Sequence, residues 1–332
     1  MVSIKDIAKK CKVSVATVSK ALNDKNDISL LTKRKIQKVA RDMGYSVNVS
    51  ARALKTNRTY NLGVLFADDR AGLSHEYFSL ILESFQHEAE RNGYDITFIN
   101  HAIAGVKTTY LKHAEYRKLD GIVIMTADFE NKEIIDLVNS KLPVIVLDHI
   151  YKNIPAVVSD NTVGLEEIVH YAYKMGHRKI AYIHGEDTKV TIDRRSGFHR
   201  ACMQLGLKIP DEYIVGSKYH DISSCVRATK KVASLKDRPT CIIFPDDYSY
   251  IGGLETLNRL GLSVPDDISC IGYDGINMAK FMNLTTYEQN TEALGRIAAK
   301  RLIEMINDDV KYGDYTIITG KLLKGKTVKK IA

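Results

Sequence analysis

The sequence predicts an α/β protein with a small all-α head at its N-terminus and a two-lobed, doubly wound core. The chain has 332 residues, which is enough for on the order of two or three domains. Residues 1–46 show apolar side chains at helical spacing, whereas short β-branched runs alternate with helical segments from Asn61 onward. Such alternation is typical of parallel sheets that are covered by helices on both faces.

The excess positive charge of the chain is concentrated in its N-terminal part. Residues 1–60 contain 14 Lys and Arg against 4 Asp, a net charge of +10, which leaves 34 basic and 36 acidic side chains for the rest. This asymmetry favours a polyanionic partner for the N-terminal part. Nucleic acid is favoured over a membrane because no amphipathic face rich in Trp, Phe or Leu accompanies the charge. A basic surface that is merely solvated is the alternative.

The sequence argues against a secreted or membrane protein. The opening MVSIKDIAKKC has charges too frequent for a signal peptide, and no run approaches the roughly 18 apolar residues of a membrane span. The 5 cysteines are odd in number and form no CxxC pair. We therefore expect a cytoplasmic protein without membrane contact, whose cysteines are reduced core residues.

Apolar spacing predicts three short helices in the head. Ser3 is expected to cap the first helix, and its inward face is Ile4, Ile7, Ala8 and Cys11. Ser14 is expected to cap the second, and its inward face is Val15, Val18, Ala21 and Leu22. The third is expected to begin at Thr32 and end at Gly44, burying Ile36, Val39, Ala40 and Met43. Its outer face is expected to carry Lys33, Arg34, Lys35, Lys38 and Arg41.

The first two helices and the tight turn between them predict a helix-turn-helix. Its second helix exposes small polar side chains and a lysine, so that it can enter a major groove and approach the base edges. Hydroxyl groups on this helix can bind phosphate or base. The candidate DNA-contacting residues are Ser14, Val15, Ala16, Thr17, Ser19 and Lys20. A helical hairpin used for protein contacts is the alternative.

The residues 46–60 that follow predict a short hinge. Asn48 can cap a helix that runs through Leu54, but so short a helix is marginal in water. DNA flanked by Arg52 and Lys55 is the natural partner to stabilise it.

Several segments carry a resemblance to a known family. IKDIAKKCKVSVATVSKALN, ISLLTKRKIQKVARDMGY and NVSARAL resemble the DNA-binding head and hinge of the lactose-repressor family of bacterial transcription regulators. Further on, MGHRKIAYIHG, RRSGFHRA, RPTCIIFPDD, GLSVPDDISCIGYDG and LTTYEQN resemble its periplasmic-binding-protein-like effector core, in the same order. The resemblance extends from residue 3 to about residue 328.

The chain departs from the pattern of this family at several positions. Lys12 stands where Gly is usual, so that the turn must avoid a positive φ or accept strain. Lys20 stands where Arg is common, and a lysine lacks the bidentate fork of arginine, which leaves the base preference open. Val47 stands where Pro is frequent. For Leu54, the resemblance implies insertion into a central minor-groove step that kinks the duplex. Packing of Leu54 between head and core is the alternative.

Seven apolar runs predict the strands of the core, namely NLGVLFA, YDITFIN, DGIVIMT, PVIVLDH, KIAYIHG, TCIIFPDD and ISCIGYD. Helices are predicted between them, for example from Phe78 to Arg91 and from Thr162 to Met175. VVSDN and YEQN are the expected crossings between two lobes. The predicted domains are a head at 1–46, a hinge at 47–60 and a core at 61–332, in which lobe 1 is about 61–159 and 291–319 and lobe 2 about 160–290 and 320–332. The cleft between the lobes faces the carboxyl ends of the strands.

Acidic side chains at the ends of the predicted strands suggest a ligand site in this cleft. The expected rim residues are Asp148, Asp246, Asp247 and Asp274, whose carboxylates can accept hydrogen bonds from vicinal hydroxyl groups. Capping of the following helix is the alternative for Asp247. The resemblance implies an effector site of Phe78, Asp148, Arg194, Tyr219, Asp246, Asp274 and Gln289. Asp246 stands where Asn is usual and the loop 67–77 is longer than typical, which leaves the ligand's identity open.

Sequence motifs of catalysis are not found. The chain has no GxGxxG after its first predicted strand and no GxSxG. HEYF at 75–78 and the pairs Asp68-Asp69 and Asp246-Asp247 lack the spacing of metal ligands. The sequence therefore predicts no enzyme activity, no cofactor and no metal.

These observations together predict a homodimeric transcription regulator, a repressor of carbohydrate-use genes. It is expected to bind a pseudo-palindromic operator in double-stranded DNA, with two heads on two half-sites. A small effector in the cleft, a sugar or sugar derivative, is expected to switch its operator affinity. The alternatives are a regulator controlled by a phosphorylated carrier protein as corepressor, and a sugar-binding protein without a regulatory role. Whether the ligand releases DNA or promotes binding stays open.

Overall fold

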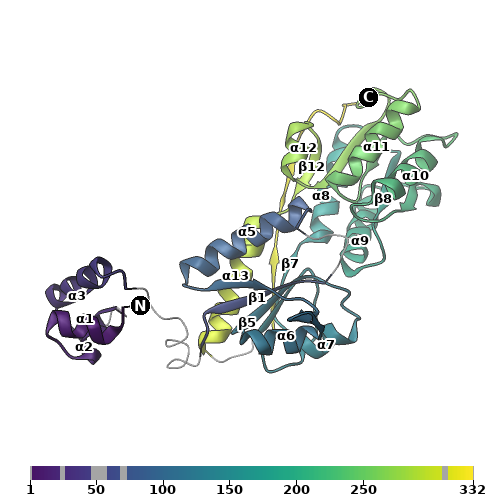
Figure 1. The fold of residues 1–332 in the computed structure, drawn as a ribbon. Coiled ribbons are helices and arrows are strands. Elements are labelled where there is room, and N and C mark those ends of the chain that lie inside the picture. The colour runs from purple at the N-terminus through teal and green to yellow at the C-terminus, as the bar shows by residue number, and fades with distance from the viewer. Residues whose placement is uncertain (1, 23–26, 46–57, 68–72, 309–312, 332) are drawn as a thin grey trace. The chain divides into compact units, whose positions relative to one another are not determined.

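The computed structural model describes residues 2–22, 27–45, 58–67, 73–308 and 313–331 (Figure 1). The chain divides into two compact units, Met1–Thr59 and Tyr60–Ala332. Within the described ranges, none of the helices combines the length and apolarity that crossing a lipid bilayer requires. The predicted hinge residues Asn48, Arg52, Leu54 and Lys55 lie outside the described residues.

The described residues of the first unit form the helices α1 (Ile4–Cys11), α2 (Val15–Leu22) and α3 (Leu30–Asp42). A reciprocal capping box begins α1, because the hydroxyl of Ser3 accepts from Asp6 N and the carboxylate of Asp6 accepts from Ser3 N. The hydroxyl of Ser14 accepts from Thr17 N at 3.0 Å at the start of α2. A serine also caps α3, which therefore begins two residues before the predicted Thr32.

The three helices share one small apolar core, formed by Ile7, Ala8, Cys11, Val18, Ala21, Ile36 and Ala40. Two expectations about this core were wrong. Val15 is 45% exposed, because the buried face of α2 is centred on Val18 and Ala21. Lys33 is only 7% exposed, since it lies one and two turns before Ile36 and Ala40 on the buried face of α3.

The turn between α1 and α2 accepts a strained backbone. Lys12 has φ of 56° and ends α1 in the left-handed conformation, where its N–H faces the carbonyl groups of Ala8 and Lys9. The turn was expected either to avoid a positive φ at this lysine or to accept strain, and the chain adopts the positive φ.

The described residues of the second unit form two six-stranded sheets and a small hairpin, and Figure 1 shows how these strands alternate with helices. In spatial order the first sheet consists of β13 (Tyr315–Ile318), β7 (Ala156–Ser159), β6 (Val144–Leu147), β5 (Gly121–Thr126), β1 (Asn61–Phe66) and β2 (Asp95–Phe98). The second consists of β14 (Lys321–Leu323), β12 (Thr285–Glu288), β11 (Ser269–Asp274), β10 (Cys241–Ile243), β8 (Ile180–His184) and β9 (Ile214–Gly216). All neighbouring strands are parallel except β12 and β14, which are antiparallel. Each of the seven predicted strands is present.

Helices cover both faces of each sheet, which confirms the doubly wound α/β fold. The apolar clusters place α5 (Glu76–Arg91) and α13 (Thr291–Asp308) on one face of the first sheet, and α6 (Tyr110–Arg117) and α7 (Lys132–Val138) on the other. The second sheet packs between the pair α8 (Asn161–Lys174) and α9 (Lys189–Gln204) and the pair α10 (Ile222–Ala233) and α11 (Asp247–Arg259). A short helix, α12 (Asn277–Phe281), follows β11, and β3 (Ala102–Ile103) pairs with β4 (Val106–Lys107) in a hairpin.

The chain passes between the two sheets at three points. It leaves the first sheet after β7, returns after β12, and crosses again between β13 and β14. These points coincide with VVSDN, with YEQN and with the predicted boundary near residue 319. The carboxyl ends of both sets of parallel strands are followed directly by connecting loops or helices, and the site described below lies among them.

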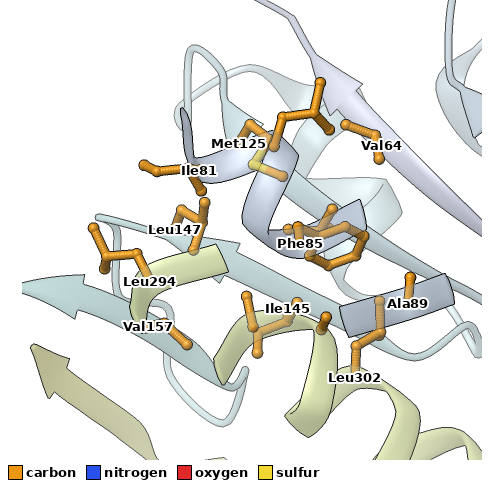
Figure 2. Packing of buried hydrophobic residues seen from close by; sticks show 14 of the residues in the cluster. Val64, Ile81, Phe85, Ala89, Met125, Ile145, Leu147, Val157, Leu294 and Leu302 are labelled. Carbon is orange, nitrogen blue, oxygen red and sulfur yellow. The ribbon is translucent and has the colours of Figure 1, made fainter. Parts of the chain in front are cut away.

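Helices α5 and α13 pack closely over the first sheet. Figure 2 shows Phe85 and Ala89 of α5 beside Leu302 of α13 in the buried apolar cluster. Gly295 permits this approach, because a Cβ atom there would lie 2.2 Å from the carbonyl oxygen of Ile81. The two nearest obstructing atoms, the Ile81 carbonyl oxygen and the Phe85 nitrogen, belong to the backbone and cannot rotate away as a flexible side chain would.

We expect Gly295→Ala to lower the free energy of unfolding by about 1–3 kcal/mol, because the added methyl group forces α5 and α13 apart. Urea unfolding of both proteins measures the difference. The control is Gly216→Ala on the edge strand β9, where the nearest atom to the new Cβ is at 3.4 Å and little change is expected. Equal stability of the Gly295→Ala protein and the parent would contradict the close packing of these helices.

Candidate functional site

Helix α2 presents a largely exposed surface on the first unit. Ser14, Val15, Ala16 and Lys20 are exposed, and the candidate residues Thr17 and Ser19 are half-buried. The hydroxyl groups of Ser14 and Thr17 lie 2.8 Å apart and are engaged with each other. Lys20 forms an ion pair with Asp27, with Nζ 2.5 Å from Oδ2, in which both side chains are about half exposed. An exposed ion pair of this kind contributes little to stability, and the lysine can exchange the aspartate for another anion.

Exposed cations also lie on the other two helices of this unit. They are Lys5, Lys9 and Lys10 of α1, Lys12 after it, and Arg34, Lys35, Lys38 and Arg41 of α3. The head is therefore a compact basic unit whose second helix offers small side chains to a partner. This arrangement suits a phosphate backbone that flanks a groove.

A cavity of about 1110 Å³ lies in the second unit and is lined by residues that follow strands of both sheets. Six of the eight predicted effector residues line it, namely Phe78, Asp148, Arg194, Tyr219, Asp274 and Gln289. The lining combines aromatic rings with acidic and basic groups. It is large enough for a ligand of sugar size and offers hydrogen-bond partners from several directions.

Arg194 of α9 is held rigidly in the wall of this cavity. Its Nε donates to Asn161 Oδ1 at 2.8 Å and its Nη1 donates to the carbonyl oxygen of Pro245 at 2.8 Å. Its guanidinium lies 3.6 Å from the centre of the Tyr273 ring, a cation–π contact. Its Nη2 is 3.9 Å from Asp274 Oδ1. The remaining donors of this side chain are thereby directed to the carboxylate and the cavity.

Two acids at strand ends have backbones in the left-handed region. Asp148 follows β6 with φ of 50°, and Asp274 ends β11 with φ of 110°. Residues other than glycine rarely adopt these angles, and such strain is concentrated at functional sites. The carboxylate of Asp148 accepts from Ser159 N at 2.7 Å and from the hydroxyl of Tyr77 at 2.9 Å. Gln289 Nε2 donates to Asp274 Oδ1 at 2.7 Å.

Burial shifts the protonation of these two acids. It raises the pKa of the Asp274 carboxyl to about 7, although Arg194 acts in the opposite direction. Burial likewise raises the pKa of Asp148, against the hydrogen bonds from Ser159 and Tyr77. Both groups therefore hold a proton more readily than an exposed aspartate does.

Asp246 and Asp247 do not line the cavity, contrary to expectation. Asp246 caps α11 by accepting from Ser249 N at 2.6 Å, the capping role considered for its neighbour, and also accepts from His220 N. Asp247 is completely buried and accepts from Gly275 N at 2.7 Å and from the hydroxyl of Thr286 at 2.6 Å. Because Asp246 caps α11, the first helical residue, Asp247, points inward. Its carboxylate thereby links the turn that follows β11 with strand β12.

Several cavity residues were not predicted from the sequence, among them Tyr77, Phe129, His149, Lys189, His220 and Tyr248. The rings of Phe129 and His149 stack at 4.2 Å with an interplanar angle of 8° and form an aromatic wall. The only sequence signal for His149 and His220 was adjacency to the predicted residues Asp148 and Tyr219.

Three consecutive residues at the start of α5 contact the part of the unit that carries the second sheet. The ring of His75 lies 3.4 Å from the ring of His220, measured between centroids. The carboxylate of Glu76 accepts from Asn277 N at 2.9 Å. The hydroxyl of Tyr77 lies 3.3 Å from Gln289 Oε1. Burial lowers the pKa of His75 to about 3, so that this imidazole is neutral.

Comparison with known families gives two matches. Residues 3–48 match the model described as bacterial regulatory proteins, lacI family, and residues 169–328 match the periplasmic binding protein-like domain. The chain is 30% identical over 323 residues to the "Probable HTH-type transcriptional repressor ExuR" of Bacillus subtilis, covering 93% of this chain and 92% of that protein. It is 29% identical over the full length of both chains to the "HTH-type transcriptional repressor PurR" of Vibrio vulnificus.

Solved structures of similar proteins show the same fold. The lac repressor dimer bound to operator and the anti-inducer ONPF matches with a TM-score of 0.78 at 21% identity, covering 99% of each chain. The complex of the transcriptional regulator CelR with cellobiose matches with a TM-score of 0.70 at 19% identity, covering 98% of this chain and all of that one.

Proposed function

The chain belongs to the lacI family of bacterial regulatory proteins, and from this premise we propose that it is a transcriptional repressor whose affinity for a DNA operator is controlled by a small effector. The observation that carries the proposal is the combination of a compact basic unit exposing α2 with a second unit that contains a polar and aromatic cavity. We propose a regulatory rather than an enzymatic role, and a cytoplasmic location, which agrees with binding to DNA.

The proposed organisation follows the two units. Residues 1–46 are the DNA-binding head and 47–60 the hinge, while the remainder is the effector core with one lobe for each sheet. One head has little surface for specific binding, so that the functional form is a homodimer on an operator with two related half-sites. The proposed contacts of the hinge are those of Asn48, Arg52, Leu54 and Lys55.

We propose that α2 enters the major groove and that Val15 and Ala16 read bases. Both are exposed on its first turn, and the N-terminal residues of a recognition helix are the ones that contact base edges. Ser14, Thr17 and Ser19 are placed for phosphate or base contacts beside them. Lys20 binds DNA by exchanging Asp27 for a phosphate or a base acceptor.

A double substitution of Val15 and Ala16, to residues of different size, is expected to change the preferred half-site, by about 1–3 kcal/mol for each altered base pair. Selection of binding sites from a random DNA library measures this preference. Lys35→Ala on α3 is the control, because an exposed lysine remote from the first turn of α2 weakens all sites evenly if it contacts phosphate. An unchanged selected motif for the double variant would refute base reading by these residues.

The effector we propose is a sugar or a sugar derivative. Asp148 and Asp274 can accept from neighbouring hydroxyl groups, and Arg194 supplies donors to a ring oxygen or a carboxylate. Phe78 and Tyr219 line the same cavity and offer ring faces to the apolar face of a pyranose. Of the similar solved structures, one holds cellobiose, which agrees with this chemistry.

A thermal-shift screen against sugars, sugar acids and sugar phosphates tests the effector proposal, because a bound ligand stabilises the folded state. A ligand that raises the melting temperature is then titrated with and without operator DNA. Linkage requires operator to change the affinity for the ligand by the same factor as the ligand changes operator affinity, commonly 1–3 kcal/mol. Equal ligand affinity in both titrations would leave a DNA-binding protein without an effector switch.

A further inference from the structure

We propose that His75, His220 and Asp274 form a binding site for a divalent transition-metal ion, such as Zn²⁺, at the wall of the effector cavity. Their ligand atoms all lie within 4.8 Å of one another. His75 precedes α5, which packs on the first sheet, whereas His220 precedes α10 and Asp274 ends β11 of the second sheet. The site therefore joins the parts of the unit that carry the two sheets.

The three side chains are a ligand set that such an ion favours. Imidazole suits Zn²⁺ and Ni²⁺, and two imidazoles with one carboxylate occur in zinc sites that keep an open position. Metal–ligand distances of about 2.0–2.2 Å require the ligand atoms to approach a little further. The rings of His75 and His220, now in contact, would rotate to direct one nitrogen each at the ion.

An unsatisfied nitrogen supports the site independently. His75 is 8% exposed, and among the described residues its Nδ1 has no hydrogen-bond partner. A buried polar atom of this kind destabilises the folded state if it stays unsatisfied. A metal ion bound by this imidazole would pair the free nitrogen, either directly or by reorienting the ring.

Neighbouring groups support the other two ligands. Asp246 Oδ1 lies 3.5 Å from His220 Nδ1, and Gln289 Nε2 donates to Asp274 Oδ1 at 2.7 Å. A carboxylate beside a ligating imidazole orients the ring and raises its basicity, and an amide that donates to a ligating carboxylate holds it in place. Arg194 is the cation nearest to Asp274, but Asp246 and Asp247 are also buried beside it. An additional cation would therefore offset a local excess of buried carboxylates.

The ion would have two consequences in the cavity. His220 and Asp274 line it, so that a hydroxyl or carboxylate oxygen of the effector can complete the coordination. Since the ligands come from the two parts of the unit that carry the two sheets, the ion also fixes the distance between these parts. The second consequence rests on the proposed function, because only a repressor would transmit that distance to operator affinity.

Metal binding is tested on the full-length protein after removal of metal with a chelator. Zn²⁺ is added in competition with a chromophoric chelator, without effector or DNA. We expect one Zn²⁺ per chain that is lost, or weakened about 100-fold or more, in His75→Ala and in His220→Ala. The control His87→Ala removes an exposed histidine of α5 outside the cavity and should bind like the parent.

Equal Zn²⁺ affinity of the parent and both histidine variants would overturn the proposal. Circular dichroism checks folding, and a variant that does not fold is replaced by His75→Gln or His220→Asn. Anomalous diffraction at the zinc edge then gives the position of the ion, and an ion bound only elsewhere is equally contrary to the proposal. Operator binding in the presence of chelator is measured in parallel. If the protein binds operator but binds no zinc at these residues, only the metal site is contradicted. If no form of the protein binds operator, the proposed function is contradicted.

Discussion

Removal of residues 1–59 is expected to abolish specific operator binding while leaving effector binding unchanged. The boundary between the two compact units lies at this point, so that the deletion leaves the core Tyr60–Ala332 with its own apolar clusters. The deleted residues carry almost all the excess positive charge of the chain. The core that remains has 34 basic and 36 acidic residues beyond position 60 and therefore no net positive charge to attract a phosphate backbone.

The size of this effect follows from the usual difference between specific and non-specific binding, which is about 10³–10⁷-fold. Fluorescence anisotropy with labelled operator measures the loss, and calorimetry with the ligand found by screening measures what the core retains. For the full-length protein, affinity should also fall with salt, with a log–log slope near −0.9 for each phosphate neutralised. Specific binding of operator by the truncated chain would contradict the assignment of DNA binding to the head.

The fold could be predicted from the sequence because its signals are local. A β-branched apolar run such as NLGVLF becomes a buried parallel strand wherever it lies in the chain, and β1 occupies Asn61–Phe66 as predicted. Helix ends were less certain, because they depend on which hydroxyl group becomes the cap. Ser29 rather than a later residue caps α3, and the helix begins two residues earlier than predicted.

The direction of single side chains was harder to predict. Apolar spacing predicts an inward Val15, and Lys33 is predicted on the outer face with the other charged residues of its helix. The helix faces decide otherwise, because Lys33 shares its face with the buried Ile36 and is only 7% exposed. In the same way, Asp246 and Asp247 were both expected at the rim, but only the start of α11 determines which of two adjacent acids becomes the cap.

The cavity could be predicted in part. Asp148 and Asp274 end strands, and parallel strands bring their carboxyl ends together, so that these acids were expected to meet. Arg194 and Gln289 were known only through the resemblance. The group of His75, His220 and Asp274 has no spacing motif, since its members belong to three distant segments that only the packing of two sheets brings within 4.8 Å.

Arg194→Ala is expected to remove effector binding and to lower the free energy of unfolding by about 3–5 kcal/mol. The guanidinium is nearly completely buried and is the hydrogen-bond donor to Asn161 Oδ1 and to the carbonyl oxygen of Pro245. Its removal takes the donor from the Pro245 carbonyl oxygen, leaves Asn161 Oδ1 only the Tyr273 hydroxyl at 3.5 Å, and leaves Asp274 without its nearest cation. Breaking a buried ion pair from one side has a cost of this size because the other charge stays buried.

The substitution Arg194→Lys should retain little of the effector affinity and of the stability that Arg194 provides. A lysine cannot donate to Asn161, to Pro245 and toward Asp274 from one planar group. Arg195→Ala, at the next and less buried position of α9, is the matched control and should leave both quantities nearly unchanged. Urea unfolding gives the stability, and calorimetry gives the affinity for the effector. Because α2 and the head belong to a separate unit, the folded Arg194→Ala protein should still bind operator with the affinity of the effector-free parent. Effector affinity equal to that of the parent would show that the ligand does not use this guanidinium. Our assignment requires that operator binding by the variant no longer responds to the effector.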